Sequence, residues 1–232
     1  MDERVETKRI WIIAPSTRLW TEFLERDPNS MKSLAAVGLA AILLLGASAT
    51  AGASNPAEPN IVTDTCSQCH GNNGISSTEW FPDLAAQTKT YLETQLKNFR
   101  NHTRADHYAK AYMWNMAGTL PDKTIKEIAA YYKEQKPPKG STTQNPQEVA
   151  AGEAIFKNGI TSENVPACGA CHGANAEGNS MFPRLAGQHR EYLVAQLQAF
   201  RDKSRNNAIM YANVQHMTDA QMRAVAAYLA SL

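Results

Sequence analysis

One five-residue motif occurs twice in the 232-residue chain, as Cys66–His70 and again as Cys168–His172, and the two copies contain all four cysteines. The pattern C-x-x-C-H is typical of the attachment of c-type haem. Its thiols form thioether bonds to the haem vinyl groups, and the adjacent histidine is the proximal iron ligand. The sequence therefore predicts two covalent haems, with His70 and His172 as proximal ligands. The predicted attachment residues are Cys66, Cys69, Cys168 and Cys171.

Two other kinds of site use paired cysteines. A structural zinc site can be built from two C-x-x-C pairs, but its second pair normally follows within a few tens of residues. Here the two pairs are about a hundred residues apart. A redox-active dithiol needs a βαβ context, and no β-branched run flanks either motif. Neither alternative explains why a histidine follows both pairs, so haem attachment is the favoured interpretation.

The likeness between the two halves extends well beyond the cysteines. Residues Phe81–Arg100 align without gaps to Phe182–Arg201, with eleven of twenty positions identical. Residues Leu120–Tyr131 align in the same way with Met217–Tyr228. Each half therefore reads as C-x-x-C-H, then F-P-x-L-A-x-Q, then two further matched stretches. We interpret the chain as a tandem duplication.

The repeated stretches have helical periodicity. In residues 91–99 and 192–200, large side chains recur on one face of a helix. Thr218 followed by Gln221 is a capping-box pattern that begins a last helix, and residues 146–156 suggest a short helix before the second cysteine motif. No long stretch alternates with period two, so we expect an all-α fold. We also expect the apolar stripes to form core rather than an interaction surface.

The beginning of the chain has the layout of an export signal. Met31 starts a short basic stretch, which is followed by an apolar core of about twelve residues and a small-residue exit near Ala53. That core is shorter than the roughly twenty residues of a membrane-spanning helix. Residues 1–30 have no counterpart in the repeat, and we interpret Met31 as the true start of translation. Export through a cleaved signal peptide would place the protein in the periplasm.

These observations divide the chain into four parts. The predicted parts are a leader and signal peptide at 1–53, a first domain at 54–136, a linker at 137–146 and a second domain at 147–232. The linker is assigned from its proline, glycine and polar composition. Between the expected cleavage site and Cys66 only about a dozen residues remain, and Pro56 and Pro59 interrupt them. The first domain therefore lacks room for a full N-terminal helix.

A methionine occupies the same register in both halves. Met113 and Met210 each stand seven residues before the last matched stretch, in a segment that we expect to be a loop. A thioether ligand favours ferrous iron and raises the potential of a haem, so we predict these two methionines as the distal ligands. The other candidates lack a partner in the repeat. They are Met116, Met217, His102, His107, His189 and His216.

Two prolines, Pro82 and Pro183, also repeat at eleven or twelve residues after the motif histidines. A proximal histidine needs an acceptor for its second ring N–H, and a backbone carbonyl in this segment could provide it. Spacing alone does not distinguish this role from that of a proline that starts the following helix.

The charges of the chain nearly balance. There are 23 Lys and Arg against 22 Asp and Glu, a formal net charge of +1. No basic field is present that would attract nucleic acid, so we expect no nucleic-acid partner.

The doubled combination of C-x-x-C-H-G, F-P-x-L-A-x-Q-x-x-x-Y-L-x-x-Q-L-x-x-F-R and a methionine segment makes residues 64–232 resemble the dihaem cytochrome c4 family. The resemblance implies two class I cytochrome c domains related by a pseudo-twofold axis. It also implies His/Met ligation of both irons, with the carbonyls of Pro82 and Pro183 accepting from the histidines. Proteins that look like this carry electrons in the bacterial periplasm, often to a terminal oxidase, and are commonly associated with the membrane.

Three functions follow from a two-haem chain of this kind. The first is a free electron carrier between redox proteins, taking electrons from an upstream cytochrome complex or dehydrogenase and giving them to a terminal oxidase. The second is an electron-accepting subunit within a periplasmic dehydrogenase complex. The third is a dihaem peroxidase, which requires an open iron position. Two filled axial positions in each half favour a carrier over an enzyme.

Overall fold

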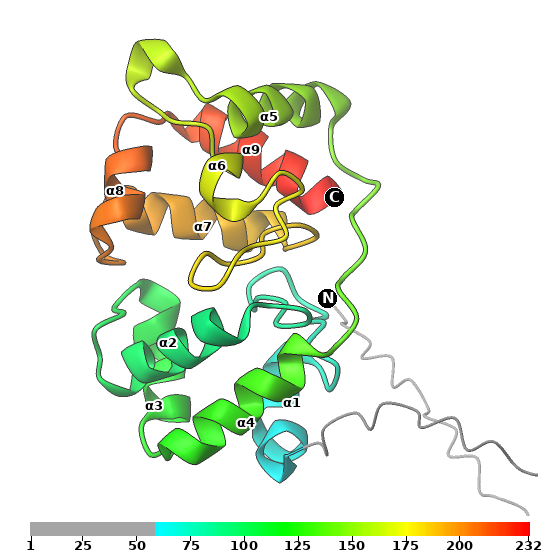
Figure 1. Cartoon of the computed structure of the whole chain (residues 1–232), viewed down its shortest axis with the longest axis vertical. Helices are drawn as coiled ribbons and strands as arrows, with labels where there is room; N and C mark the ends of the chain where they lie inside the picture. The colour runs from blue at the N-terminus through cyan, green and yellow to red at the C-terminus, as the bar shows by residue number, and fades with distance from the viewer. Residues whose placement is uncertain (1–58) are drawn as a thin grey trace, which may run out of the picture. The chain divides into compact units, whose positions relative to one another are not determined.

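The computed structural model describes residues 59–232, and this part of the chain contains helices but no strand (Figure 1). Two isolated β-bridges, Ile160–Val165 and Asn179–Phe182, are the extent of its β structure. The expectation of an all-α fold is confirmed. The leader and signal peptide predicted at 1–53 lie outside the described residues. No helix within 59–232 is both long and apolar enough to cross a membrane.

The helices follow the same order in both halves after each cysteine motif. In the first half they are η1 (Val62–Cys66), α1 (Ser67–His70), α2 (Lys89–Arg100), η2 (Ala109–Met113), α3 (Trp114–Ala117) and α4 (Asp122–Lys133). In the second half they are α5 (Pro146–Asn158), η3 (Thr161–Glu163), α6 (Gly169–His172), α7 (Arg190–Arg201), α8 (Ala208–Val214) and α9 (Asp219–Ser231).

Sequence determines several of these helix ends. The side chain of Thr88 accepts a hydrogen bond from the backbone N–H of Tyr91 and so caps α2. The capping box expected from Thr218 and Gln221 is present at the start of α9, and α5 begins at Pro146 behind the cap Asn145.

Each half has its own apolar core. The stripe on α2 contributes to the core of the first half, and the stripe on α7 contributes to that of the second. Leu92 and Phe99 are buried in the first half, as are Leu193 and Phe200 in the second. The polar members of these stripes, such as Tyr91 and Gln95, do not belong to either core. They face the other half, so the expectation that the stripes form only core was wrong for them. Hydrophobic periodicity reports the buried face of a helix without saying what covers it.

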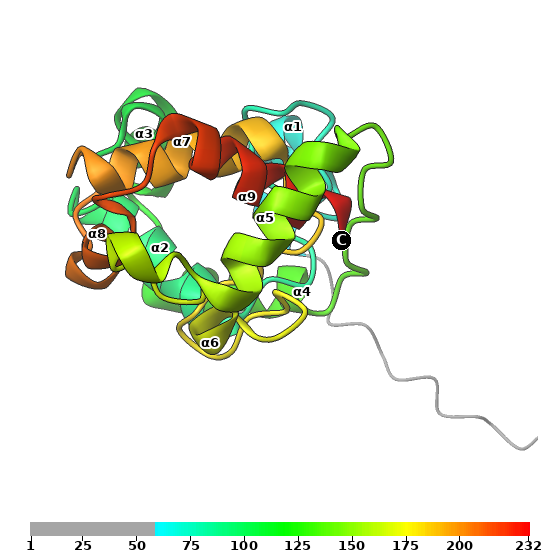
Figure 2. The same cartoon turned by 90° about the horizontal axis from the view of Figure 1, so that it is seen from above.

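The second half has a helix pair with no counterpart among the described residues of the first half. Helix α5 crosses α9 closely at Gly152, where a Cβ would lie 1.9 Å from the carbonyl oxygen of Ala224 (Figures 1 and 2). The ring of Phe156 is fully buried one turn further along, with its centroid 5.5 Å from that of Tyr228. In the first half the described helical turns start only at Asn60 and run directly into the cysteine motif, with Val62 buried in the core. Within the described residues, the first half therefore reaches its cysteine motif after only a few helical residues.

The two halves are joined by glutamines that end the repeated F-P-x-L-A-x-Q segment. The Gln87 side chain accepts from the Arg184 N–H at 2.7 Å and donates to the Arg184 carbonyl at 3.0 Å. The Gln188 side chain makes the same pair of bonds, both 2.9 Å, with the backbone of Asp83. Positions 83 and 184 are equivalent in the repeat, as are 87 and 188, so the exchange follows the expected pseudo-twofold relation. Both glutamines are buried, and each bond contributes about 1 kcal/mol on average.

A histidine next to this exchange adds a contact between the halves. Nε2 of His189 lies 3.4 Å from Oδ1 of Asp83, close enough for an ion pair but outside the geometry of a directed hydrogen bond. The nearby Asp83 carboxylate raises the pKa of His189 above its ordinary value of 6.5, although partial burial opposes the shift.

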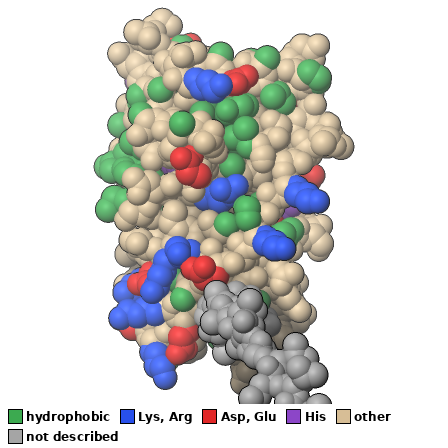
Figure 3. All heavy atoms as spheres, turned by 45° about the vertical axis from the view of Figure 1, so that its right-hand side comes forward, with side chains coloured by type: hydrophobic (Ala, Val, Ile, Leu, Met, Phe, Trp, Pro, Cys, Tyr) green, Lys and Arg blue, Asp and Glu red, His purple; other side chains and the backbone are tan. Residues whose placement is uncertain are grey.

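Charged side chains on the surface are mixed in sign. On the face shown in Figure 3, Lys and Arg side chains alternate with Asp and Glu, and no broad area carries one sign. Several are paired along α4, including Lys123 with Glu127 and Lys133 with Glu134. On this face the distribution agrees with the balanced composition.

The close crossing of α5 and α9 predicts a destabilising Gly152→Ala substitution. The added methyl group must displace backbone atoms of α9, so we expect the free energy of unfolding of the haem-loaded protein to fall by about 1–3 kcal/mol. Helix propensity alone would raise it by about 1 kcal/mol. Urea unfolding followed by far-UV circular dichroism measures the change. Ala151→Gly, on the exposed side of the same helix, is the control and should cost only helix propensity. An unchanged or increased stability of Gly152→Ala would contradict the crossing.

The contact between His189 and Asp83 predicts a pH-dependent stability. Because the folded pKa of His189 is raised, its contribution is complete below the unfolded pKa and is lost as pH rises through the folded pKa. We expect His189→Asn to destabilise the protein at about pH 5 and to have little effect at about pH 8.5, by up to about 1 kcal/mol. Urea unfolding of both proteins at the two pH values tests this. Equal destabilisation at both would mean that the ion pair contributes nothing.

Candidate functional site

The two motif histidines end short helices and are buried. His70 is the last residue of α1 and His172 the last of α6, and each is 7 % exposed. The glycine that follows each of them has a positive φ, 72° for Gly71 and 87° for Gly173. At Gly71 a Cβ would lie 2.2 Å from the Ile75 carbonyl oxygen. The glycine in C-x-x-C-H-G therefore allows the chain to turn sharply away behind the histidine.

Each histidine is held by a proline carbonyl. His70 Nδ1 lies 2.8 Å from the Pro82 oxygen, and His172 Nδ1 lies 3.0 Å from the Pro183 oxygen. A carbonyl oxygen can only accept, so Nδ1 carries the proton and Nε2 presents its lone pair. The implied role of the two prolines is thus confirmed. The alternative that they start helices was wrong, since α2 and α7 begin several residues later.

Burial keeps both imidazoles neutral. It lowers the pKa of His70 and of His172, and the hydrogen bonds to the proline carbonyls offset only part of that effect. The edge of Phe81 packs against His70 with ring centroids 6.1 Å apart, and Phe182 packs in the same way against His172 at 6.3 Å. A neutral, fixed imidazole with a free Nε2 is suited to bind a metal centre.

The four cysteines lie beside these histidines, and none of them forms a disulfide. Burial raises the pKa of Cys66 and raises that of Cys168 to about 11. A reactive dithiol requires a lowered pKa, so these thiols do not resemble a redox-active pair. Within residues 59–232 no three His, Cys, Asp or Glu side chains gather in a way that could hold a metal ion. The zinc alternative therefore has no supporting cluster in the described part of the chain.

Met113 and Met210 lie on short helices rather than in loops. Met113 ends η2, and Met210 lies in the first turn of α8. The expectation of a loop was wrong, because both helical segments are too short for apolar periodicity to reveal. The Asn207 side chain accepts from the backbone N–H of Met210 at 2.9 Å and so begins α8. Both methionines are partly buried against the core of their own half.

A cavity of about 780 Å³ brings the predicted residues together. It is lined by both cysteine motifs, by Met113 and Met210, and by the apolar side chains of α2 and α7. Among the histidines of the described residues only His70 and His172 line it. His102 stacks on Trp114 instead, with centroids 4.1 Å apart. Met116 and Met217 do line the cavity, so position alone does not exclude them.

This donor set fits haem. Thiols, a neutral imidazole and a thioether lie on the same apolar cavity in each half. Those are the groups that bind the vinyl carbons and the iron of a c-type haem. The apolar walls would surround the macrocycle and keep water from it.

Two arginines in the cavity wall were not among the site residues predicted from the sequence. Arg104 and Arg205 occupy equivalent positions in the repeat and are each 7 % exposed. The Arg104 guanidinium lies 4.7 Å from the centroid of the Phe99 ring, and that of Arg205 lies 4.5 Å from the centroid of Phe200. The sequence did contain a signal for them, because an arginine recurs at the same position of the repeat, shortly after each apolar stripe.

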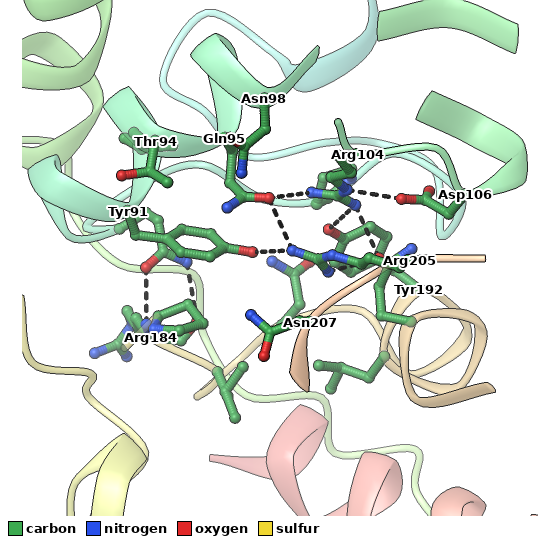
Figure 4. A pocket seen from close by; sticks show the side chains of 18 of the residues that line it. Tyr91, Thr94, Gln95, Asn98, Arg104, Asp106, Arg184, Tyr192, Arg205 and Asn207 are labelled. Atoms are coloured by element: carbon green, nitrogen blue, oxygen red, sulfur yellow. Dashed lines mark hydrogen bonds and ion pairs between the residues drawn. The ribbon is translucent and has the colours of Figure 1, made fainter. Parts of the chain in front are cut away.

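These arginines connect the halves through tyrosine and glutamine side chains (Figure 4). Arg104 donates to Gln95 in its own half at 3.0 Å and to Gln196 across the interface at 2.8 Å. Arg205 repeats the pattern with Gln196 at 2.6 Å and Gln95 at 2.9 Å. Each also reaches the hydroxyl of the opposite tyrosine, Arg104 that of Tyr192 and Arg205 that of Tyr91. This is what the polar members of the two helical stripes contact.

Comparison with known proteins agrees with this geometry. The Cytochrome c family model matches the chain twice, at residues 59–136 and 149–232. Cytochrome c-552 of Acidithiobacillus ferridurans is 41 % identical over 195 residues, covering 83 % of this chain and 85 % of that protein. The thiosulfate dehydrogenase electron acceptor of Thiomonas intermedia is 36 % identical over 174 residues, covering 72 % and 78 %.

A solved structure has the same two-domain arrangement. The structure of cytochrome c4 from Acidithiobacillus ferrooxidans superposes with a TM-score of 0.69 at 42 % identity, covering 72 % of this chain and 98 % of that one. With cytochrome c domains in two tandem copies, each with its own C-x-x-C-H motif, the chain carries two covalently bound c-type haems. It is an electron-transfer protein rather than an enzyme, so the peroxidase hypothesis has no support. We conclude that the chain belongs to the dihaem cytochrome c4 family.

Proposed function

We propose that the protein is a periplasmic electron carrier in which both irons are six-coordinate. The axial ligands are His70 and Met113 in the first half and His172 and Met210 in the second. The observation that supports this is that each half places one neutral histidine and one methionine, in matched register, on the same cavity. When bound, each haem supplies the one-electron chemistry of its iron. Side chains then fill both axial positions, which suits transfer of electrons rather than turnover of a substrate.

Exposed apolar side chains at the cavity mouth support docking of redox partners there. Trp80 and Tyr112 are 53 % and 46 % exposed in the first half, and Met181 and Ile209 are 62 % and 57 % exposed in the second. In each half, one of the two residues directly precedes the F-P segment and the other directly precedes the matched methionine. Transient redox partners use small interfaces, and we place the donor and acceptor contacts at these two patches. From the family resemblance alone, we propose a terminal oxidase as the final acceptor.

A second candidate function is that of an electron-accepting subunit in a periplasmic dehydrogenase complex. The similarity to the thiosulfate dehydrogenase electron acceptor favours it. Affinity purification of the exported protein from its own cells distinguishes the two. A stoichiometric larger chain with dehydrogenase activity would support the subunit, and a lone cytochrome would support the free carrier.

The ligand assignment predicts opposite specificity for two substitutions. Met210→Ala should lower the potential of the second-half haem only, and Met113→Ala that of the first-half haem only. We expect a fall on the order of 0.1 V or more, because axial ligands set haem potentials over about 0.8 V. Each variant should also bind carbon monoxide at one iron. Redox titration and carbon monoxide difference spectra measure both effects.

The unpaired methionines provide matched controls. Met116→Leu and Met217→Leu keep the side-chain volume and should leave both potentials and the low-spin spectrum unchanged. If one of these removes a methionine–iron band while Met113→Ala or Met210→Ala does not, the register argument is wrong.

Export and haem attachment predict one intact mass. Protein isolated from the periplasm should have the mass of a chain that starts near residue 54, increased by two haems. Its reduced-minus-oxidised spectrum should be that of low-spin c-type haem. A mass without added haem, or retention of residues 1–53, would contradict this proposal.

A further inference from the structure

Each predicted axial methionine is directly followed by an aromatic residue. Trp114 follows Met113 at the start of α3, and Tyr211 follows Met210 within α8. Both aromatic residues are partly buried. Because each of them is bonded to its methionine through the backbone, a contact that holds the ring also restrains the segment that carries the sulfur.

A side chain from the preceding loop covers each ring. The imidazole of His102 is stacked on the Trp114 ring, with centroids 4.1 Å apart and an angle of 16° between the planes. In the second half Nζ of Lys203 lies 4.1 Å from the centroid of the Tyr211 ring, within range of a cation–π contact. His102 and Lys203 each stand two residues after the last residue of α2 or α7. The same contact is thus made in both halves by different side chains.

The backbone at these two positions is left-handed. The φ angle is 58° at His102 and 59° at Lys203, and their N–H groups donate to the carbonyls of Phe99 and Phe200 at 3.1 and 3.2 Å. A residue in this conformation after a helix is most often glycine, because a Cβ is crowded there. Both halves nevertheless have a large side chain at this point, and each side chain contacts the ring. Ending the helix does not by itself account for that choice.

The first half holds its ring with a further contact. Nε1 of Trp114 donates to the backbone carbonyl of Arg104 at 2.7 Å, two residues after His102. The ring therefore ties the loop after α2 to the segment of Met113. The second half ties the equivalent segments together through Lys203 and its ring contact.

A methionine ligand depends on its surroundings more than a charged one does. Its sulfur is neutral, so no attraction between opposite charges holds it on an iron. Ligating side chains must be kept within about 0.5 Å of their productive geometry by the packing around them. Here the segments are short, since α8 has seven residues and η2 only five. Segments with few buried contacts open locally most often, and a clamp on the adjacent ring would make such opening rarer.

We propose that His102 and Lys203 are positioning residues that clamp the aromatic ring beside each axial methionine and so keep its sulfur on the iron. The inference rests on the proposed ligation by Met113 and Met210. The clamp acts through the ring and the backbone, and neither residue is itself a ligand. Loss of an exposed cation–π contact should raise the open fraction of the α8 segment about two- to fivefold. Loss of His102 should have a smaller effect, because the Nε1 bond of Trp114 remains.

Glycine at position 203 separates clamping from overall stability. Lys203→Gly removes the side chain but also relieves the left-handed backbone, so the urea midpoint of the haem-loaded protein should stay equal or rise. The same variant should speed cyanide binding to one ferric haem about two- to fivefold, because cyanide reaches that iron only after the methionine leaves. Hydrogen exchange followed by mass spectrometry should rise in α8 and not in α3. Lys203→Arg keeps a cation over the ring and should behave as the unsubstituted protein.

Two further variants test whether the ring transmits the effect. Tyr211→Leu should speed cyanide binding to the same haem, and adding Lys203→Gly to it should give no further increase. Asn164→Gly is the matched control, because Asn164 is another exposed residue with a positive φ, 55°, at the end of η3. It should leave cyanide binding at both haems unchanged.

The outcomes separate this inference from the proposed function. If Met210→Ala leaves both potentials and cyanide binding unchanged, the proposed ligation fails. If Met210→Ala opens one haem but Lys203→Gly changes neither cyanide binding nor exchange in α8, the clamp is overturned. It is also overturned if Lys203→Gly changes them only together with a lower urea midpoint, or if Tyr211→Leu and Lys203→Gly act additively.

Discussion

The hydrogen bond between each buried histidine and a proline carbonyl is the interaction on which both halves depend. It joins the cysteine-bearing helix to the F-P-x-L-A-x-Q segment and fixes which ring nitrogen carries the proton. Five residues after each proline, Gln87 or Gln188 binds the backbone of the other half. One short segment therefore orients the imidazole and also positions its half against the partner. Two constraints, rather than one, explain why this segment is the most similar part of the repeat.

The chemistry of the site was readable from sequence, and its surroundings were not. Cysteine spacing identified haem attachment because no other common site needs a histidine after each C-x-x-C pair. Helix limits near Thr218 and Pro146 followed from caps that act locally. The contact of Gln95 with the other half could not be predicted from the sequence. Periodicity marks the buried side of a helix without identifying the neighbour that buries it. The helix that carries Met210 was not predicted, because it is too short to show a helical period.

The two halves differ most in regions that do not contact the other half. The second half closes its core with α5 packed on α9, while the first uses a few turns around Val62. At the cavity mouth the first half exposes aromatic side chains such as Trp80, and the second exposes aliphatic ones such as Ile209. The shared interior has changed least. These differences thus lie at the start of each half and at the cavity mouth.

The glutamine exchange also bears on how such a chain could arise. Gln87 binds the backbone of Arg184, and Gln188 binds the backbone of the equivalent residue, Asp83. Two identical subunits make the same kind of reciprocal contact around a twofold axis. A homodimer of a single-domain ancestor could form it without any new residue, and gene fusion would preserve it. Because the glutamines bind only backbone atoms, these bonds place no requirement on the side chains at the two positions. They are now an acid, Asp83, and a base, Arg184.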